Sequence, residues 1–259
     1  PLADRIMAEI TAEDVEGVIE ASTTVFEGHR RNARALFEYG ARRGWCPSGL
    51  LKSIERRSMQ SAETTTLTPA EVRNVMEAAE KHYPETVSAF AVAIFAGVRM
   101  AELERLRWRD VHADGIEVSS ATAKKRRRRF LPMNPTLAAW LAGRRPDNAS
   151  EFVVPANWHE KSTAVRRLAG FKVVARILSD PPKLPKEAPM WPQNAMRHTH
   201  ASAAIANGVS LDELIFAFGH TGTPEMLKSH YVGMYRPNDA AAFWGIGPKG
   251  QIIPTIRAA

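Results

Sequence analysis

The segment NAMRHTHAS, residues 194–202, is the most informative part of this sequence. Small and apolar residues recur in and after it at helical spacing, which predicts a helix that carries Arg197 and His198. Taken singly, Arg197 is typical of a surface charge or an ion-pair partner, and His198 of a buried, hydrogen-bonded histidine. Two more polar clusters follow, FGHT at 218–221 and HY at 230–231. The ordered series Arg, Gly-His and His-Tyr, separated by short helices, indicates groups that meet at one ligand.

A second fixed cation lies about a hundred residues upstream, in the segment AGVRMAEL, residues 96–103. Gly97 permits a sharp backbone turn. Arg99 then stands at the start of the next helix, where free amides and the helix dipole also favour an anion. The alternative is a solvated arginine with Glu102 as its counter-charge. A tyrosine hydroxyl beside several such cations is what an enzyme needs to attack a phosphodiester.

Six consecutive cations, KKRRRR at residues 124–129, stand between two strand-like segments. Short β-type runs around 114–115 and 124–127 predict a small antiparallel sheet, with the basic run at a hairpin tip. A hairpin tip can enter a groove of DNA, with most of its cations meeting phosphates.

Composition limits the class of protein. The 259 residues are 44% hydrophobic and carry a formal net charge of +7, so we expect a packed core and an anionic partner. Charge alone leaves nucleic acid, acidic membrane and acidic protein open. A single cysteine excludes an internal disulfide and a cysteine-based zinc site. Because no apolar run approaches about 20 residues, we expect no membrane span. The start, without Met or a signal-peptide pattern, favours a cytoplasmic fragment that lacks its natural N-terminus.

Two domains are predicted, residues 1–60 and 61–259. Residues 11–57 look helical, with a break in the pattern at Gly40, Gly44 and Pro47, and the polar residues 58–67 form the best linker in the chain. Helix starts are indicated by Thr68 with Pro69 and Glu71, Asn134 with Pro135, Ser210 with Glu213, and Thr223 with Pro224. The expected fold is mainly α with a small antiparallel β-sheet, an α+β architecture.

These motifs together resemble the catalytic domain of the tyrosine recombinases, the phage-integrase-type DNA recombinases. The resemblance covers roughly residues 68–245, and five ordered elements carry it. AGVRMAEL followed by LRWRDV, residues 106–111, is similar to the first arginine box of the family, and NAMRHTHAS to the second. Lys124, eight residues before Pro132, matches the β-hairpin lysine. FGHT resembles the Gly-His element, and Tyr231 the nucleophile. Residues 1–57 are a weaker match to the end of the core-binding domain.

The resemblance implies a DNA strand transferase that needs neither cofactor nor metal. Tyr231 would attack the scissile phosphate, Arg99 and Arg197 would hold its oxygens, and Lys124 would protonate the leaving 5′ oxygen. His220 would hydrogen-bond the phosphate or help to deprotonate Tyr231, and Asn194 would complete the phosphate contacts. The implied partner is double-stranded DNA, bound by a homotetramer on two duplexes. Without DNA we expect a monomer or weak oligomer, and with DNA a nucleoid-associated protein. Expected DNA contacts are Lys125, Arg126, Arg127, Arg128, Arg129, Arg30, Arg31 and Arg34.

The sequence departs from the family pattern at two points. Asn194 stands where the second box usually begins with His, and an amide cannot act as a general acid or base. Tyr231 follows His220 by eleven residues, about two more than is common, which leaves Tyr235 as a minor rival nucleophile.

Three other interpretations stay open at this point. Residues 210–218 and 223–231 could form a helix-turn-helix of a non-catalytic DNA-binding protein, with Tyr231 merely packed. A type IB topoisomerase would use a similar site and rejoin the same strand. A zinc site is the least favoured, because its histidines lie among many arginines; it would use His198, His200, His220 and His230.

Overall fold

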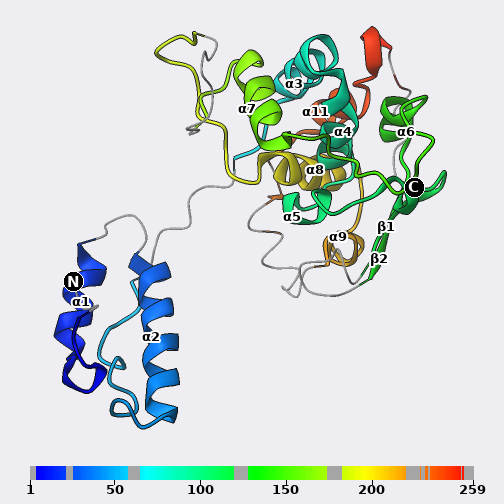
Figure 1. The fold of residues 1–259 in the computed structure, drawn as a ribbon. Coiled ribbons are helices and arrows are strands. Elements are labelled where there is room, and N and C mark those ends of the chain that lie inside the picture. Colours follow the sequence, from blue (N-terminus) through cyan, green and yellow to red (C-terminus); the bar gives the residue numbers. More distant parts are fainter. Residues whose placement is uncertain are drawn as a thin grey trace. The chain divides into compact units, whose positions relative to one another are not determined.

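We describe the fold from a computed structural model of the chain. It describes residues 4–21, 26–57, 65–119, 128–173, 183–219, 228, 231–232, 234–251 and 253. The chain divides into two compact units, Pro1–Ala62 and Glu63–Ala259, here the N-terminal and C-terminal units. Figure 1 shows the elements of each unit.

The N-terminal unit is a pair of helices closed by a stretch of turns. A 3₁₀ turn, Met7–Glu9, precedes α1 (Ala12–Glu20), and α2 spans Phe26–Arg42. Residues 43–57 form turns instead of the predicted helix, with Gly44 and Gly49 at positive φ. Such backbone ends a helix cheaply only at glycine. The core is made by Ile10, Val15, Ile19, Phe26, Phe37, Cys46, Leu51 and Ile54.

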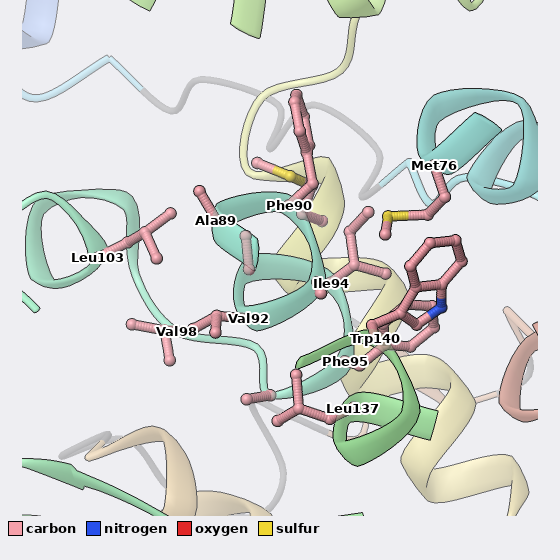
Figure 2. Close-up of a cluster of buried hydrophobic side chains, with 14 of the residues drawn as sticks. Met76, Ala89, Phe90, Val92, Ile94, Phe95, Val98, Leu103, Leu137 and Trp140 are labelled. Carbon is pink, nitrogen blue, oxygen red and sulfur yellow. The ribbon is translucent and has the colours of Figure 1, made fainter. Parts of the chain in front are cut away.

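The C-terminal unit is built around one wholly buried helix, α4 (Val87–Phe95). It packs against α3 (Pro69–His82), α6 (Pro135–Leu141) and α8 (Ala195–Ala206). A helix that is apolar all round has no surface to offer water, so it belongs in the centre. Figure 2 shows side chains of three of these helices meeting, with Phe95 and Trp140 near Met76.

The remaining elements surround this core. The short helix α5 spans Met100–Leu103, and 3₁₀ turns cover Pro84–Thr86, Trp108–Asp110 and Pro248–Gly250. Strands β1 (Gly115–Val118) and β2 (Arg129–Pro132) pair antiparallel, with Val118 opposite Arg129. Further helices are α7 (Trp158–Leu168), α9 (Leu211–Phe218) and α11 (Pro237–Trp244).

The predicted fold class, mainly α with a small antiparallel sheet, is confirmed. The helix starts at Thr68, Asn134 and Ser210 are confirmed as well, because each side chain accepts a backbone N–H of its own first turn. Strand β1 begins at the predicted position, Gly115, whereas β2 begins at Arg129, just after the predicted run 124–127. The start at Thr223 lies outside the described residues. Among the residues that are described, no helix is long and apolar enough to cross a membrane.

Candidate active site

The turn after α4 sets the position of Arg99. Gly97 has a φ of +62°, and a Cβ there would come 2.7 Å from His200 Cδ2 and 2.9 Å from Phe218 Cε1. Only glycine therefore lets this backbone lie against α8 and α9. Arg99 becomes the N-cap of α5, with its side chain 18% exposed. The predicted turn at Gly97 is confirmed.

Arg99 is fixed by two acceptors from different parts of the sequence. Its Nη1 lies 3.2 Å from Glu102 Oε1, one turn along α5. Its Nη2 donates to the carbonyl of Gly219 at 3.4 Å, at the end of α9. The predicted pairing of Glu102 with Arg99 is confirmed, and the guanidinium is held in place instead of being free in solvent.

Glu102 has a second partner, Arg129 of β2, which sequence reasoning missed. The two side chains are buried, with Arg129 Nη2 2.5 Å and Nη1 3.2 Å from the two carboxylate oxygens. Arg129 Nε also donates to the carbonyl of Ala217 at 2.7 Å. Burial alone would raise the pKa of Glu102, but its ion pairs with Arg129 and Arg99 outweigh burial and lower that pKa. Arg129 is thus not the exposed DNA contact that we expected, because its guanidinium faces inward.

Arg197 lies on α8, and its guanidinium contacts the end of α9, as that of Arg99 does. Its Nη1 donates to the carbonyl of Gly97 at 2.6 Å, and its Nη2 to that of Phe218 at 2.9 Å. Its guanidinium carbon stands 3.6 Å from the centre of the Phe218 ring. Burial, then the charge of Arg99, lowers the pKa of Arg197 to about 9, so the group stays cationic at neutral pH.

The two arginines therefore meet at the end of α9. Arg197 binds the carbonyl of Phe218 and Arg99 that of Gly219, the next residue. The last carbonyls of a helix lack intrahelical partners and carry the negative end of its dipole, so they suit cations. Gly219 has a φ of +55°, which ends α9 there. The end of α9 thus brings together the two arginine boxes.

Tyr231 lies in the field of both arginines. It is 5% exposed and packs with Ala201, Leu214 and Phe218 of α8 and α9. Burial raises its pKa above the ordinary value, while the charges of Arg197 and Arg99 act in the opposite direction. The phenol therefore holds its proton at neutral pH in this structure. Its Oη lies 2.9 Å from His198 Nδ1, a contact that the sequence did not reveal.

Tyr235, the rival nucleophile, has a different environment. Its hydroxyl donates to the carbonyl of Leu67, just before α3, and the residue is 7% exposed. Burial, then the charges of Asp239 and Glu71, raises its pKa. This hydroxyl is part of the packing between the start and the end of the C-terminal unit, away from the arginine boxes.

An open pocket of about 300 Å³ adjoins the arginines. Arg99, Arg197 and Asn194 line it together. Asn194 is the N-cap of α8 at a φ of 55°, and its side chain makes no capping hydrogen bond there. Its amide can therefore turn to a ligand. The structure brings these three predicted site residues to one cavity.

Arg166 of α7 lines the same pocket and was not predicted. Its guanidinium carbon lies 4.8 Å from the centre of the Trp191 ring, and burial lowers its pKa to about 10. Its Nε is buried without a hydrogen-bond partner among the described residues. In the sequence it looks like any cation near a helix C-terminus, so no local signal marks it.

Other predicted residues lie outside the described part of the chain, namely Lys124, Lys125, Arg126, Arg127 and His220. Arg128 is described; its side chain is 73% exposed and lies 2.8 Å from Glu117 of β1. In the N-terminal unit, Arg30, Arg31 and Arg34 all line a hollow of about 740 Å³, and Arg30 is also buried in an ion pair with Glu27.

The described residues contain no group of three side chains that could hold a metal ion. Two histidines of the zinc interpretation have separate surroundings. His198 contacts Tyr231, whereas the ring of His200 packs against Phe218 and Trp244. Burial, then the charge of Arg197, lowers the pKa of His200 to about 4. The other two, His220 and His230, lie outside the described residues.

A helical unit that carries paired guanidinium groups beside a phenol is typical of tyrosine-dependent DNA strand transferases. Residues 65–235, more than half of the chain, match the phage integrase family. The chain therefore belongs to this family of tyrosine recombinases, which are DNA strand transferases, as the motifs predicted. A comparison with curated proteins gave no match.

Solved structures of integrases share the fold. A lambda integrase dimer bound to a COC′ core site has 16% sequence identity and a TM-score of 0.59, over 89% of this chain and 82% of that one. A lambda integrase tetramer bound to a Holliday junction has 15% identity and a TM-score of 0.60, over 88% and 66%. The Tn1549 transposon integrase in complex with circular intermediate DNA has 17% identity and a TM-score of 0.55, over 91% and 85%.

Proposed function

We propose that this protein is a site-specific recombinase or integrase that cuts and rejoins strands of duplex DNA through a 3′-phosphotyrosyl intermediate. One observation carries the proposal: Arg99 and Arg197 converge on the end of α9, and both charges act on Tyr231. A tyrosine that attacks phosphorus keeps the energy of the broken bond in the covalent intermediate, so rejoining needs no ATP. We also propose that the reaction is independent of metal.

The arginines have the chemistry that this reaction needs. Negative charge grows on the non-bridging oxygens as phosphorus becomes five-coordinate, and fixed cations stabilise that state without reorganising. A guanidinium stays charged and can bind two oxygens at once. Arg99 and Arg197 are already held by carbonyl and carboxylate acceptors, so their directions are set before DNA binds. Asn194, at the same pocket, would donate a further hydrogen bond to the phosphate.

Lys124 and His220 complete the proposal on the grounds of the sequence resemblance. We propose that Lys124 protonates the leaving 5′ oxygen as a general acid, and that His220 hydrogen-bonds the phosphate. The carbonyl of Gly219, directly before His220, accepts a hydrogen bond from Arg99. This contact of the preceding residue supports the role proposed for His220.

Cations outside the arginine pair would hold the DNA backbone. We propose phosphate contacts for the hairpin residues Lys125, Arg126, Arg127 and Arg128, for Arg31 and Arg34 in the N-terminal unit, and for Arg166 at the pocket. Arg30 and Arg129 are left out, because each is buried in an ion pair. We further propose a homotetramer on two duplexes, because a lambda integrase of similar fold was solved as a tetramer on a Holliday junction.

A covalent-adduct assay tests this function. The protein is incubated with duplexes that carry a randomised core and a nick that prevents rejoining, and protease-sensitive adducts are collected without metal. We expect Tyr231→Phe to abolish the adduct and Tyr235→Phe to retain it. An unchanged yield with Tyr231→Phe, or an adduct that requires added metal, would contradict the proposal. No adduct at all, with salt-dependent binding retained, would favour a non-catalytic DNA-binding protein.

A second duplex separates the recombinase from a type IB topoisomerase. The selected site is offered together with a free 5′-hydroxyl end on another duplex. We expect strands to be joined between the two duplexes. Rejoining confined to the original strand, with relaxation of supercoils, would favour the topoisomerase.

A further inference from the structure

His198 forms a hydrogen bond with the hydroxyl of Tyr231. Its Nδ1 lies 2.9 Å from Tyr231 Oη, and the two rings are 5.4 Å apart between centres. His198 follows Arg197 directly on α8, so the helix that fixes the phosphate-binding arginine also fixes this imidazole. The distance is within the range that a general base needs.

The phenol of Tyr231 needs a base that accepts its proton. Burial outweighs the neighbouring arginines and keeps the pKa of Tyr231 above its ordinary value, so the hydroxyl is protonated near neutral pH. A phenol attacks phosphorus well only as its proton leaves. Asn194 cannot accept that proton, because an amide is not a base in this range. A neutral imidazole can.

The charges around the pair favour the transfer once substrate is bound. Arg197 and Arg99 both favour a phenolate at Tyr231. A proton taken up by His198 adds positive charge beside Arg197, its neighbour on α8, and a nearby anion offsets that charge. A phosphodiester between the two arginines supplies that anion. The transfer is thus coupled to the arrival of DNA.

His200, two residues further along α8, has an environment different from that of His198. It packs against Phe218 and Trp244, and the desolvation of its ring, then the charge of Arg197, lowers its pKa to about 4. Its ring packs against the Gly97 turn. His200 therefore supports the fold of the site, whereas His198 contacts the reacting hydroxyl.

We propose that His198 is a catalytic residue, the general base that takes the proton of Tyr231. The inference rests on the proposed function. Tyr231 Oη forms a bond to phosphorus as the bond from phosphorus to the 5′ oxygen breaks. The phenolic proton passes to His198 Nδ1, and the leaving 5′ oxygen takes a separate proton from Lys124. On rejoining, a 5′-hydroxyl gives its proton to the Lys124 amine, and His198 returns its proton to the departing phenolate.

The tautomer of His198 tests the proposal without DNA. A base at Nδ1 requires a neutral ring with its proton on Nε2, so that Tyr231 donates and the imidazole accepts. Two-bond ¹⁵N–¹H spectra of the whole protein at pH 8 report the tautomer, with the His198 signals assigned by their loss in His198→Gln. We expect Nδ1 to be unprotonated, and its shift to change in Tyr231→Phe. A proton on Nδ1 would overturn the proposal, because His198 would then be a donor to Tyr231.

Chemical rescue tests the same role in catalysis. With the DNA site selected by the adduct assay, His198→Ala should slow adduct formation about a hundredfold or more. His198→Gln keeps a polar side chain but not a base, and should be equally slow. Added imidazole should restore His198→Ala at least about tenfold, as expected for a lost general base. It should leave Tyr231→Phe inactive, and also leave His112→Ala, a change at an exposed histidine, at the wild-type rate.

The two proposals fail in different ways. If wild-type protein forms the Tyr231 adduct but His198→Gln is as fast, the recombinase stands and the base is wrong. If His198→Ala is slow and imidazole does not rescue it, His198 has only a structural role. If no adduct forms, the function itself is wrong, and the tautomer then decides only which atom donates in the His198–Tyr231 hydrogen bond.

Discussion

The arginines of the candidate active site in the C-terminal unit and Arg31 and Arg34 of the N-terminal unit differ in how they are held, whereas Arg30, paired with Glu27, is buried like the first group. In the C-terminal unit, Arg99, Arg129 and Arg197 are each bound by at least two acceptors and are largely withdrawn from solvent. In the N-terminal unit, Arg31 and Arg34 line an open hollow of about 740 Å³.

The difference reflects two demands of one reaction. Stabilising a transition state requires charges fixed in direction before substrate arrives. Holding a DNA backbone requires only positive charge near phosphates, which mobile side chains supply by releasing counterions. Fixed arginines should therefore govern the rate of cleavage, and exposed ones the affinity.

Arg197→Ala gives the largest expected effect. It removes a pre-oriented donor from the phosphate, so the rate of adduct formation at saturating DNA should fall about a thousandfold. Single-turnover kinetics with radiolabelled DNA measure it. Arg197→Lys should be nearly as slow, because an ammonium lacks the planar fork. Full activity in Arg197→Lys would show that a fixed guanidinium is not required, and Arg73→Ala on the exposed face of α3 serves as the control.

Glu102→Gln tests whether the fixed arginines depend on their buried carboxylate. The change leaves the guanidinium of Arg129 buried without its anion, which should cost about 4 kcal/mol in the free energy of unfolding. Urea denaturation followed by circular dichroism measures the loss. Glu27→Gln, the matched change beside Arg30, should cost much less, because that carboxylate is more exposed to water. Equal losses at the two sites would contradict the comparison.

Gly97→Ala tests the turn on which the arginine site is built. A methyl group there meets α8 and α9 under 3 Å and forces a positive φ on alanine. We expect a loss of about 3 kcal/mol in the free energy of unfolding. Gly143→Ala is the control, since it has a similar φ of +68° and nothing within 4 Å of the new methyl. It should lose only about 1 kcal/mol. If the two variants were equally stable, crowding at Gly97 would be excluded.

The lowered pKa of His200 predicts a loss of stability in mild acid. Its pKa is about 4 in the folded chain, against 6.5 for an ordinary histidine, so the unfolded chain binds a proton more readily between these values. Stability is therefore fully present above pH 6.5 and falls as the pH drops toward 4. Between pH 7 and pH 5 the loss from this group should be about 2 kcal/mol. The His200→Phe variant should lose less over the same interval, and an unchanged pH dependence would show that His200 is not the group responsible.

Arg31→Ala should have the smallest effect, and only on binding. Removing one exposed cation should weaken affinity for DNA of any sequence and reduce the slope of log affinity against log salt by about 1. Fluorescence anisotropy at several salt concentrations measures that slope. The rate of adduct formation at saturating DNA should stay as in the wild type. A large fall in that rate would place Arg31 in the chemistry and remove the contrast between the units.

Local signals made much of this fold predictable. Two helix starts were predictable because a cap depends only on residues within one turn, namely Thr68 with Glu71 and Ser210 with Glu213. Gly97 indicates a turn, because its backbone conformation and close contacts admit only glycine. The orientation of the side chains at the end of the basic run, residues 124–129, was harder to predict. In β2 inward and outward positions alternate, so Arg129 is buried and Phe130 exposed, and the sequence alone does not fix that register.

Contacts between distant segments were beyond sequence reasoning. Nothing near Arg166 in the sequence reveals that Trp191 covers it or that it shares a pocket with Asn194. The contact of His198 with Tyr231 spans 33 residues and depends on how α8 and α9 pack. The turns of residues 43–57 begin where Gly44 breaks the predicted helical pattern, so that end of α2 was indicated by the sequence, whereas the further helix expected up to residue 57 is absent from these described residues.

The site of covalent attachment tests the central claim most directly. After the adduct is isolated, nuclease and trypsin leave a short nucleotide on one peptide, and residues 229–249 carry both Tyr231 and Tyr235 on a single tryptic fragment. Fragmentation in a mass spectrometer then shows which tyrosine bears the phosphate. The account predicts a phosphodiester on Tyr231 alone. A phosphate on Tyr235, or on any residue of another peptide, would contradict it.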